Sequence, residues 1–300
     1  MSGRTLLQFA IVTLIWGSTW LIIRTQLGEV PPSWSVAYRF TVAAITMLTY
    51  CVLTGQSLRL DRHGHLFAVV LAVAQFGLNF NFVYRAEQHV TSGLVAVVFA
   101  LLVVPNAVLA RVFLGQRVSL RFAVGSLIGI VGVALLFQHE IALAASGQGS
   151  SSSVLFGLLL TIGGVLSASI ANVMQVTPTG LAQPRFGLLA ISFVYGAIID
   201  AGYALLTAGP PTIVLAPAYL GGLLFLGIAA SALAFPLYYD VIRAIGPAKA
   251  AYSSLIVPFL AMALSTLFEG YRWTPIAGAG AVLAVGGMWI ALSTRRAAPA

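Results

Sequence analysis

The feature that most constrains this chain is an internal repeat. Residues 90–137 and 245–292 carry the same breaks and turns at nearly the same spacing. In each copy, eleven residues separate a proline from a polar turn, and nine more lead to a glycine: Pro105, Gln116 and Gly125, then Pro258, Glu269 and Gly278. Matched offsets of this kind, following similar short polar connections, indicate an internal duplication.

Composition places the chain in a bilayer. Hydrophobic residues make up 60% of its 300 residues and charged residues only 7%, whereas soluble domains carry about 25% charged residues. A soluble core of this size would need a charged surface to cover it, and that surface is missing. Backbone amides in lipid must be bonded within each segment. We therefore expect an all-α membrane protein.

Ten apolar runs can be marked, and we expect each to form a transmembrane helix. They are residues 6–23, 34–52, 66–84, 92–112, 122–137, 154–176, 186–206, 218–238, 250–268 and 275–292. The longest connection is rich in serine and glycine and divides the helices five and five. The predicted organisation is a first repeat at 1–140, a linker at 141–153 and a second repeat at 154–300. The first run could pass for a signal peptide, but no small-residue cleavage site follows it, so we expect it to be retained.

The distribution of basic residues predicts the orientation. If the chain starts inside and the helices alternate, the inner side receives eleven of the fifteen Lys and Arg residues and the outer side four. Basic loops stay in the cytoplasm, so both termini are expected there. Because each half has an odd number of helices, the second half enters from the opposite side and the repeats are inverted. Inverted repeats place a central cavity at their interface near the membrane midplane.

Several classes of function are not expected. The basic residues are scattered over loops and form no block, so a nucleic-acid partner is excluded. The histidines His63, His65, His89 and His139 fall in or beside loops, and no hydrolase, zinc or phosphate-loop motif is present. The single cysteine, Cys51, cannot form an intrachain disulfide or a cysteine metal cluster. We expect neither an enzyme nor a metal or cofactor.

Uncharged polar and aromatic residues inside the runs are the candidate substrate-binding residues. Amides and hydroxyls at this depth must face protein or water, so they either join helices or line a cavity. Phe99 and Tyr252 occupy corresponding places in the two repeats, and Trp16 lies too deep for the interfacial belt. The predicted set is Trp16, Gln75, Asn79, Phe99, Asn172 and Tyr252. A cavity of this kind without fixed charge suits a neutral or zwitterionic solute with an apolar side chain and suits phosphate poorly.

Two ionisable residues, Arg39 and Asp200, lie within the runs near their outer ends. Charge at depth is costly by several kcal/mol and marks a function or a partner. For each of them the simpler interpretation is an interfacial anchor or a structural bond, and the long side chain of Arg39 can reach water. The functional alternative for both is coupling, as a proton or conformational switch. Gly93 and the pair Gly246-Pro247, at helix ends, are expected to permit gate movement.

The sequence resembles the EamA-type branch of the drug/metabolite transporter superfamily over nearly its whole length. The matching pieces are Leu14-Ile15-Trp16-Gly17-Ser18, Tyr38-Arg39-Phe40, Thr91-Ser92-Gly93, Ile245-Gly246-Pro247-Ala248, the two prolines and the turns at Gln116 and Glu269. Gln116 departs from the pattern, which usually has Glu there. The resemblance implies ten helices in inverted five-helix repeats, with a cavity lined mainly by helices one, three, four, six, eight and nine. It also implies export of small metabolites, and the chain looks like the YddG-type bacterial exporters of aromatic and other amino acids.

Three functions stay open. The leading hypothesis is an exporter of amino acids and related apolar metabolites, working by alternating access in the bacterial inner membrane, for which a monomer suffices. The second is a nucleotide-sugar or organophosphate exchanger of the same fold, against which the absence of a mid-membrane cation argues. The third is a receptor that binds a solute without moving it. No ATP-binding motif is present, so transport would use a gradient or run downhill.

Overall fold

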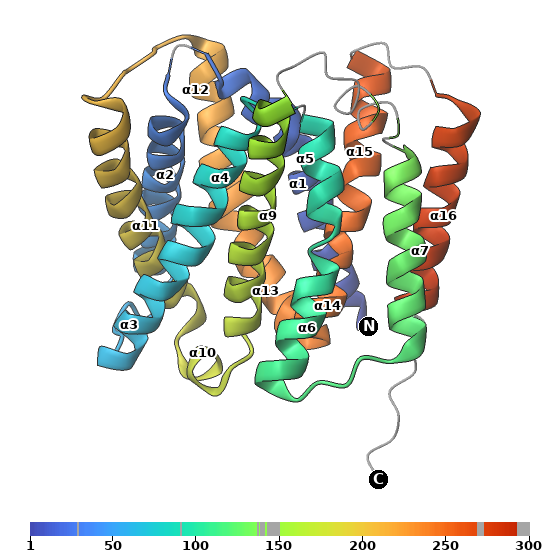
Figure 1. Cartoon of the computed structure of the whole chain (residues 1–300). Helices are drawn as coiled ribbons and strands as arrows, with labels where there is room; N and C mark the ends of the chain where they lie inside the picture. Colours follow the sequence, from blue (N-terminus) through green and yellow to red (C-terminus); the bar gives the residue numbers. More distant parts are fainter. Residues whose placement is uncertain are drawn as a thin grey trace.

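The computed structural model describes residues 1–28, 30–90, 92–136, 138, 142, 151–268 and 273–292. Within these ranges all regular elements are helices. They run side by side in one bundle (Figure 1). Thr91, His139, Glu269 and most of the expected linker at 141–153 lie outside the described residues.

The helices follow the order of the predicted runs. Those of the first half are α1 (Gly3–Gln26), α2 (Pro32–Leu53), α3 (Arg62–Leu71), η1 (Ala72–Leu78), α4 (Asn79–Ala86), α5 (Ser92–Ala100), α6 (Val103–Leu114) and α7 (Leu120–Leu136). Those of the second half are α9 (Ser151–Met174), α10 (Pro178–Ala182), α11 (Arg185–Ala208), α12 (Pro217–Leu224), η2 (Phe225–Leu233), α13 (Ala234–Ile245), α14 (Pro247–Ala250), α15 (Tyr252–Phe268) and α16 (Pro275–Leu292). The segments η1 and η2 are π-helical and occupy the middle of the continuous spans 62–86 and 217–245.

Proline positions explain a break between two of these helices. Pro105 has no N–H for the carbonyl of Leu101, which instead accepts a bond from the Val104 amide at 2.8 Å. The helix is interrupted there, between α5 and α6, as the sequence predicts. Pro258 was expected to break its helix in the same way, but it lies inside α15 without ending it.

Among the described residues, six spans are long and apolar enough to cross a membrane, judged by length and composition. They are Pro32–Leu53, Arg62–Ala86, Val95–Leu114, Ser153–Met174, Arg185–Ala208 and Pro217–Ile245. Leu120–Leu135 and Pro275–Ala291 are shorter apolar helices. Large apolar side chains such as Leu53 and Leu206 are 79% and 88% exposed, and exposed apolar surface of this kind faces lipid. The chain is thus a helical membrane protein, and the count of ten spans stays a prediction.

The helices of the two halves pack reciprocally. α2 lies against α11 and α7 against α16, and these are the second and fifth helices of each half. α1 contacts α13 and α15, while its counterpart α9 contacts α4 and α6. In Figure 1 α1 begins at the lower side and α9 at the upper side. Two related halves of opposite direction give this pattern. The boundaries of the predicted repeats, at residues 140 and 154, are not tested by it.

Glycines permit the close approach of α7 and α16, although not every glycine of α16 takes part. A methyl group on Gly132 would come within 2.7 Å of the Gly280 carbonyl, and one on Gly125 within 2.6 Å of the Gly287 carbonyl. Gly278 and Gly286 of α16 have nothing within 4 Å of an added methyl group. The rotation of α16 therefore decides which of its glycines face α7.

We expect Gly132→Ala to destabilise the protein by about 1–3 kcal/mol, because the added methyl group must push two backbones apart. Gly286→Ala on the partner helix is the matched control, since it adds the same group to open space. Its effect should stay within about 0.5 kcal/mol of zero. Thermal unfolding in detergent measures both. Equal midpoints for the two variants would contradict the assignment of this contact.

Candidate functional site

A cavity lies in the middle of the bundle, with about 780 Å³ of empty space including its mouth. Its lining comes from α1, α4 with η1, α5, α9, α13 and α15. These are helices one, three, four, six, eight and nine of the expected ten, the set that the resemblance implies. Arg39 of α2 adds a seventh helix that was not expected.

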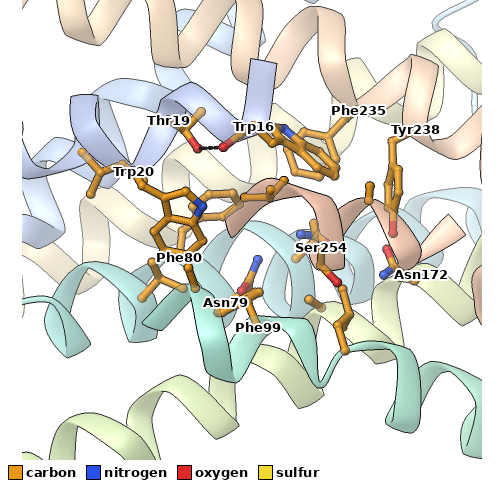
Figure 2. A pocket seen from close by; sticks show the side chains of 18 of the residues that line it. Trp16, Thr19, Trp20, Asn79, Phe80, Phe99, Asn172, Phe235, Tyr238 and Ser254 are labelled. Carbon is orange, nitrogen blue, oxygen red and sulfur yellow. Dashed lines mark hydrogen bonds between the residues drawn. The ribbon is translucent and has the colours of Figure 1, made fainter. Parts of the chain in front are cut away.

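Much of the cavity wall is aromatic. Its members are Trp16, Trp20, Phe80, Phe99, Phe235 and Tyr238. The rings of Phe235 and Tyr238 meet Trp16 edge to face, with centroids 5.4 and 4.7 Å away, and Trp20 meets Phe99 at 5.8 Å. Figure 2 shows Trp20 and Phe80 at one end and Tyr238 with Asn172 at the other. The wall can take up an apolar or aromatic group.

The indole of Trp16 is fixed by the second half of the chain. Its Nε1 donates a hydrogen bond to the carbonyl of Ala230 at 3.0 Å. Ala230 lies in the π-helical η2, where widened turns change which carbonyls have an intrahelical partner. This bond therefore joins α1 of one half to η2 of the other across the cavity.

Polar groups line the cavity between the rings. They are Thr19, Arg39, Gln75, Asn79, Asn172, Ser253 and Ser254. Gln75 Oε1, Asn79 Oδ1 and the indole nitrogen of Trp20 are buried and have no hydrogen-bond partner within the described parts of the chain. Buried polar groups without partners are costly, so these atoms are suited to bind a polar group of a ligand. In Figure 2 the hydroxyl of Tyr238 is directed toward Asn172.

Arg39 is the charged residue of this lining. Its side chain is 1% exposed, so of the two simpler interpretations the interfacial anchor that reaches water is wrong. The Nε group donates to Ser231 Oγ at 3.0 Å, and the guanidinium lies 4.3 Å from the centroid of the Phe80 ring. These contacts hold the side chain inward and prevent it from extending to water at the membrane surface. The expectation of a cavity without fixed charge is also wrong.

Five of the six predicted binding residues line the cavity: Trp16, Gln75, Asn79, Phe99 and Asn172. Tyr252 does not, and its predicted place is corrected. It is fully buried, its hydroxyl bonds Ser126 Oγ at 2.6 Å, and its ring meets Phe122. The side chain thus points from α15 toward α7, while its neighbours Ser253 and Ser254 face the cavity.

Sequence reasoning missed Phe235 and Tyr238 among the lining residues. They are three residues apart on the eighth span, a spacing that places both on one face of a helix. That spacing was the signal that could have identified them. Their position near the end of the run made them similar to interfacial aromatics.

Asp200 lies outside the cavity lining, fully buried in α11. Its Oδ1 accepts a hydrogen bond from Asn81 Nδ2 at 2.7 Å, and the same amide donates to the carbonyl of Gly77 in η1 at 2.8 Å. The residue therefore links α11 to a π-helical segment that carries Gln75. Among the described residues, no group of three His, Cys, Asp or Glu side chains is placed to hold a metal ion.

A polar network joins α1, α11 and α13 near the start of α1, which lies on the lower side of Figure 1. Asp240 of α13 pairs with Arg185 of α11 and accepts a bond from Gln8 Nε2 of α1 at 3.0 Å. Gln8 is two turns before Trp16 along α1, about 12 Å at 1.5 Å per residue. The network joins three helices on the side of the cavity where α1 begins, and we expect it to hold that end closed.

The predicted gate residues lie at helix ends. Gly93 is in the first turn of α5. Gly246 joins α13 to α14 with φ of 86°, a left-handed backbone that favours glycine. Pro247 begins α14, and its carbonyl accepts a bond from Asn106 Nδ2 of α6 at 3.0 Å. Whether these positions move is not tested by the structure.

The comparison with protein families agrees with the duplication. The sequence model of the EamA-like transporter family matches residues 3–138 and again residues 155–293. The chain belongs to the EamA-like transporter family. The resemblance to EamA proteins noted from the motifs is thereby confirmed, while the narrower likeness to YddG-type exporters is not tested by this match.

Relatives of this chain include two that are named as transporters. The uncharacterized inner membrane transporter YedA of Escherichia coli K12 is 28% identical over 264 residues, covering 86% of this chain and 80% of that protein. The uncharacterized transporter YoaV of Bacillus subtilis is 22% identical over 271 residues and 86% of each chain. Protein PagO of Salmonella typhimurium is 29% identical over 132 residues, 44% of this chain and 43% of that one. A crystal structure that is 20% identical covers 97% of the chain with a TM-score of 0.78 and shares its fold.

Proposed function

We propose that this EamA protein exports amino acids with aromatic or other apolar side chains, and related small metabolites, by alternating access. The observation that carries the proposal is the central cavity, where an aromatic wall faces unpartnered amide groups. An aromatic side chain fits the wall, and the polar groups of an amino acid fit the amides. The likeness to YddG-type exporters points to the same substrates.

The setting of the proposed exporter follows the charge pattern of the sequence. Both termini lie in the cytoplasm of a bacterial cell, and the two halves rock about the cavity in the inner membrane. Gly93, Gly246 and Pro247 absorb the movement at the helix ends. A monomer is sufficient, since the two halves of one chain enclose the cavity.

Counterflow in proteoliposomes tests this function. Vesicles loaded with unlabelled amino acids are placed in labelled phenylalanine, and we expect label to accumulate and apolar amino acids to compete. Uptake of a sugar phosphate without phenylalanine counterflow would favour the organophosphate exchanger. The buried Arg39 supplies the cation whose absence from the predicted cavity argued against this function. Stabilisation by phenylalanine without any flux would favour a receptor.

Asp200 is proposed as the residue that couples transport to protons. Counterflow needs no driving force, so we expect Asp200→Asn to keep it within about twofold of wild type while the response of net uptake to a proton gradient is lost. An amide cannot carry the proton. Ser192→Ala, two turns away on the same helix and also buried, is the control. A proton-gradient response that survives in Asp200→Asn removes the residue from coupling.

A further inference from the structure

The guanidinium of Arg39 is placed as a ligand-binding group. Arg39 is 1% exposed and lines the cavity. The Nε group is held by Ser231 Oγ at 3.0 Å, and the guanidinium carbon lies over the ring of Phe80, another lining residue. Its Nη1 is buried, and no described residue forms a hydrogen bond with it. The side chain is therefore fixed at one edge and leaves a donor free.

Arg39 also lacks a counter-ion among the residues that the structure describes. The ion pair present there joins Arg185 to Asp240, below the cavity. The hydroxyl of Tyr84 faces the guanidinium, but a phenol is uncharged at neutral pH. Neither Asp nor Glu is part of the lining. A buried cation without a partner is strongly unfavourable, so an anionic ligand has a large advantage in this cavity.

Resting on the proposed function, we propose that Arg39 binds the carboxylate of the substrate. We also propose that the cavity selects small monocarboxylates with an apolar or aromatic group, for which an ammonium group is dispensable. Arginine presents a planar fork that matches a carboxylate with two parallel hydrogen bonds. Figure 2 places Phe80 at the Trp20 end of the cavity, so the carboxylate lies at that end and the rest of the ligand extends along the aromatic wall.

The charge of the lining separates ligand classes. One guanidinium and no carboxylate leave the lining with a single positive charge. A bound monocarboxylate neutralises this charge, whereas a bound zwitterion has no net charge and leaves the net charge of the site at +1. A phosphate monoester brings about −1.5 to −2 charges and would leave a buried excess. The free oxygens of Gln75 and Asn79 can accept from an ammonium group, so amino acids bind, but no charged partner requires that group.

A matched pair of ligands tests the inference on the wild-type protein. N-acetylphenylalanine keeps the carboxylate and loses the ammonium group, whereas phenylalaninamide keeps the ammonium group and loses the carboxylate. In competition against labelled phenylalanine counterflow, we expect N-acetylphenylalanine to act within about threefold of phenylalanine. Phenylalaninamide should be weaker by about tenfold or more. An amide that competes as well as phenylalanine overturns the inference.

Variants give a second readout through binding alone. Thermal stabilisation by 3-phenylpropionate should be present in wild type, reduced in Arg39→Lys and absent in Arg39→Gln. Lysine keeps the charge but not the fork. Arg85→Gln is the control, because Arg85 bonds Tyr203 outside the cavity. Retained stabilisation in a folded Arg39→Gln variant contradicts the assignment, and if that variant does not fold, the ligand pair decides.

The two arms separate this inference from the proposed function. Stabilisation by phenylpropionate that depends on Arg39, without phenylalanine flux, would support the carboxylate site and overturn amino-acid transport. Phenylalanine flux that is unchanged in the Arg39 variants would support transport and overturn the carboxylate site. Absence of both flux and stabilisation overturns both.

Discussion

Trp16→Ala is expected to lower phenylalanine counterflow by about tenfold or more, a loss that corresponds to about 1.4 kcal/mol. The substitution removes two edge-to-face contacts, with Phe235 and Tyr238, and the hydrogen bond to the Ala230 carbonyl. Aromatic pairs contribute about 0.5–1.5 kcal/mol each beyond burial, so the expected loss needs only part of them. Counterflow by Trp16→Phe should lie between that of wild type and that of Trp16→Ala, because phenylalanine keeps a ring and loses the N–H.

Trp289→Ala is the matched control for this result. It makes the same change on α16, where the indole is 75% exposed on the outer surface. Membrane insertion and the elution profile in detergent should be normal for both variants, so that a difference in flux reports the cavity. Counterflow of Trp16→Ala within twofold of wild type would remove the indole from the substrate site.

Asp240→Ala is expected to open the lower end of the cavity. Arg185 and Gln8 both depend on this carboxylate, so its loss releases α13 from α11 and α1 together. Hydrogen bonds to charged groups contribute about 1.5–3 kcal/mol each, enough for a shift of about tenfold or more between closed and open states. A cysteine placed at Ser254 in the cavity should then react about tenfold faster with an impermeant maleimide added on that side.

The native cysteine does not interfere with this measurement, because Cys51 is fully buried. Asp240→Asn is the graded control, since an amide keeps an acceptor for Gln8 and loses the charge that pairs with Arg185. Its labelling rate should lie between those of wild type and Asp240→Ala. Equal rates in all three proteins would contradict a closing role for the network.

The depth of the site residues could be predicted from the sequence, but not their direction. An amide in lipid must face protein, which is why Gln75 and Asn79 were identified. Tyr252 has the right depth and the wrong direction. Three consecutive residues of α15, Tyr252, Ser253 and Ser254, carry hydroxyl groups, and consecutive residues point to different sides of a helix. The sequence therefore does not show which of the three faces the cavity. The neighbouring Ser253 and Ser254 face the cavity instead.

Arg39 was misplaced for a different physical reason. Its distance from the helix end allowed it to reach water, and only its neighbours decide otherwise. Ser231 and Phe80 hold it inward, and both belong to other spans. The π-helical segments had no signal in the sequence either. A prediction that considers each apolar run separately can identify the fold and most of the cavity residues. It cannot identify contacts that depend on how the spans are rotated against one another.

The bond from Trp16 to η2 has an evolutionary consequence. Its acceptor is the backbone carbonyl of Ala230 and not a side chain. Residue 230 can therefore change among relatives without breaking the bond, provided that the π-helical turn and the space around it are kept. Such a contact leaves no paired substitutions between positions 16 and 230. Two positions that are coupled in the structure can thus vary independently in a lineage.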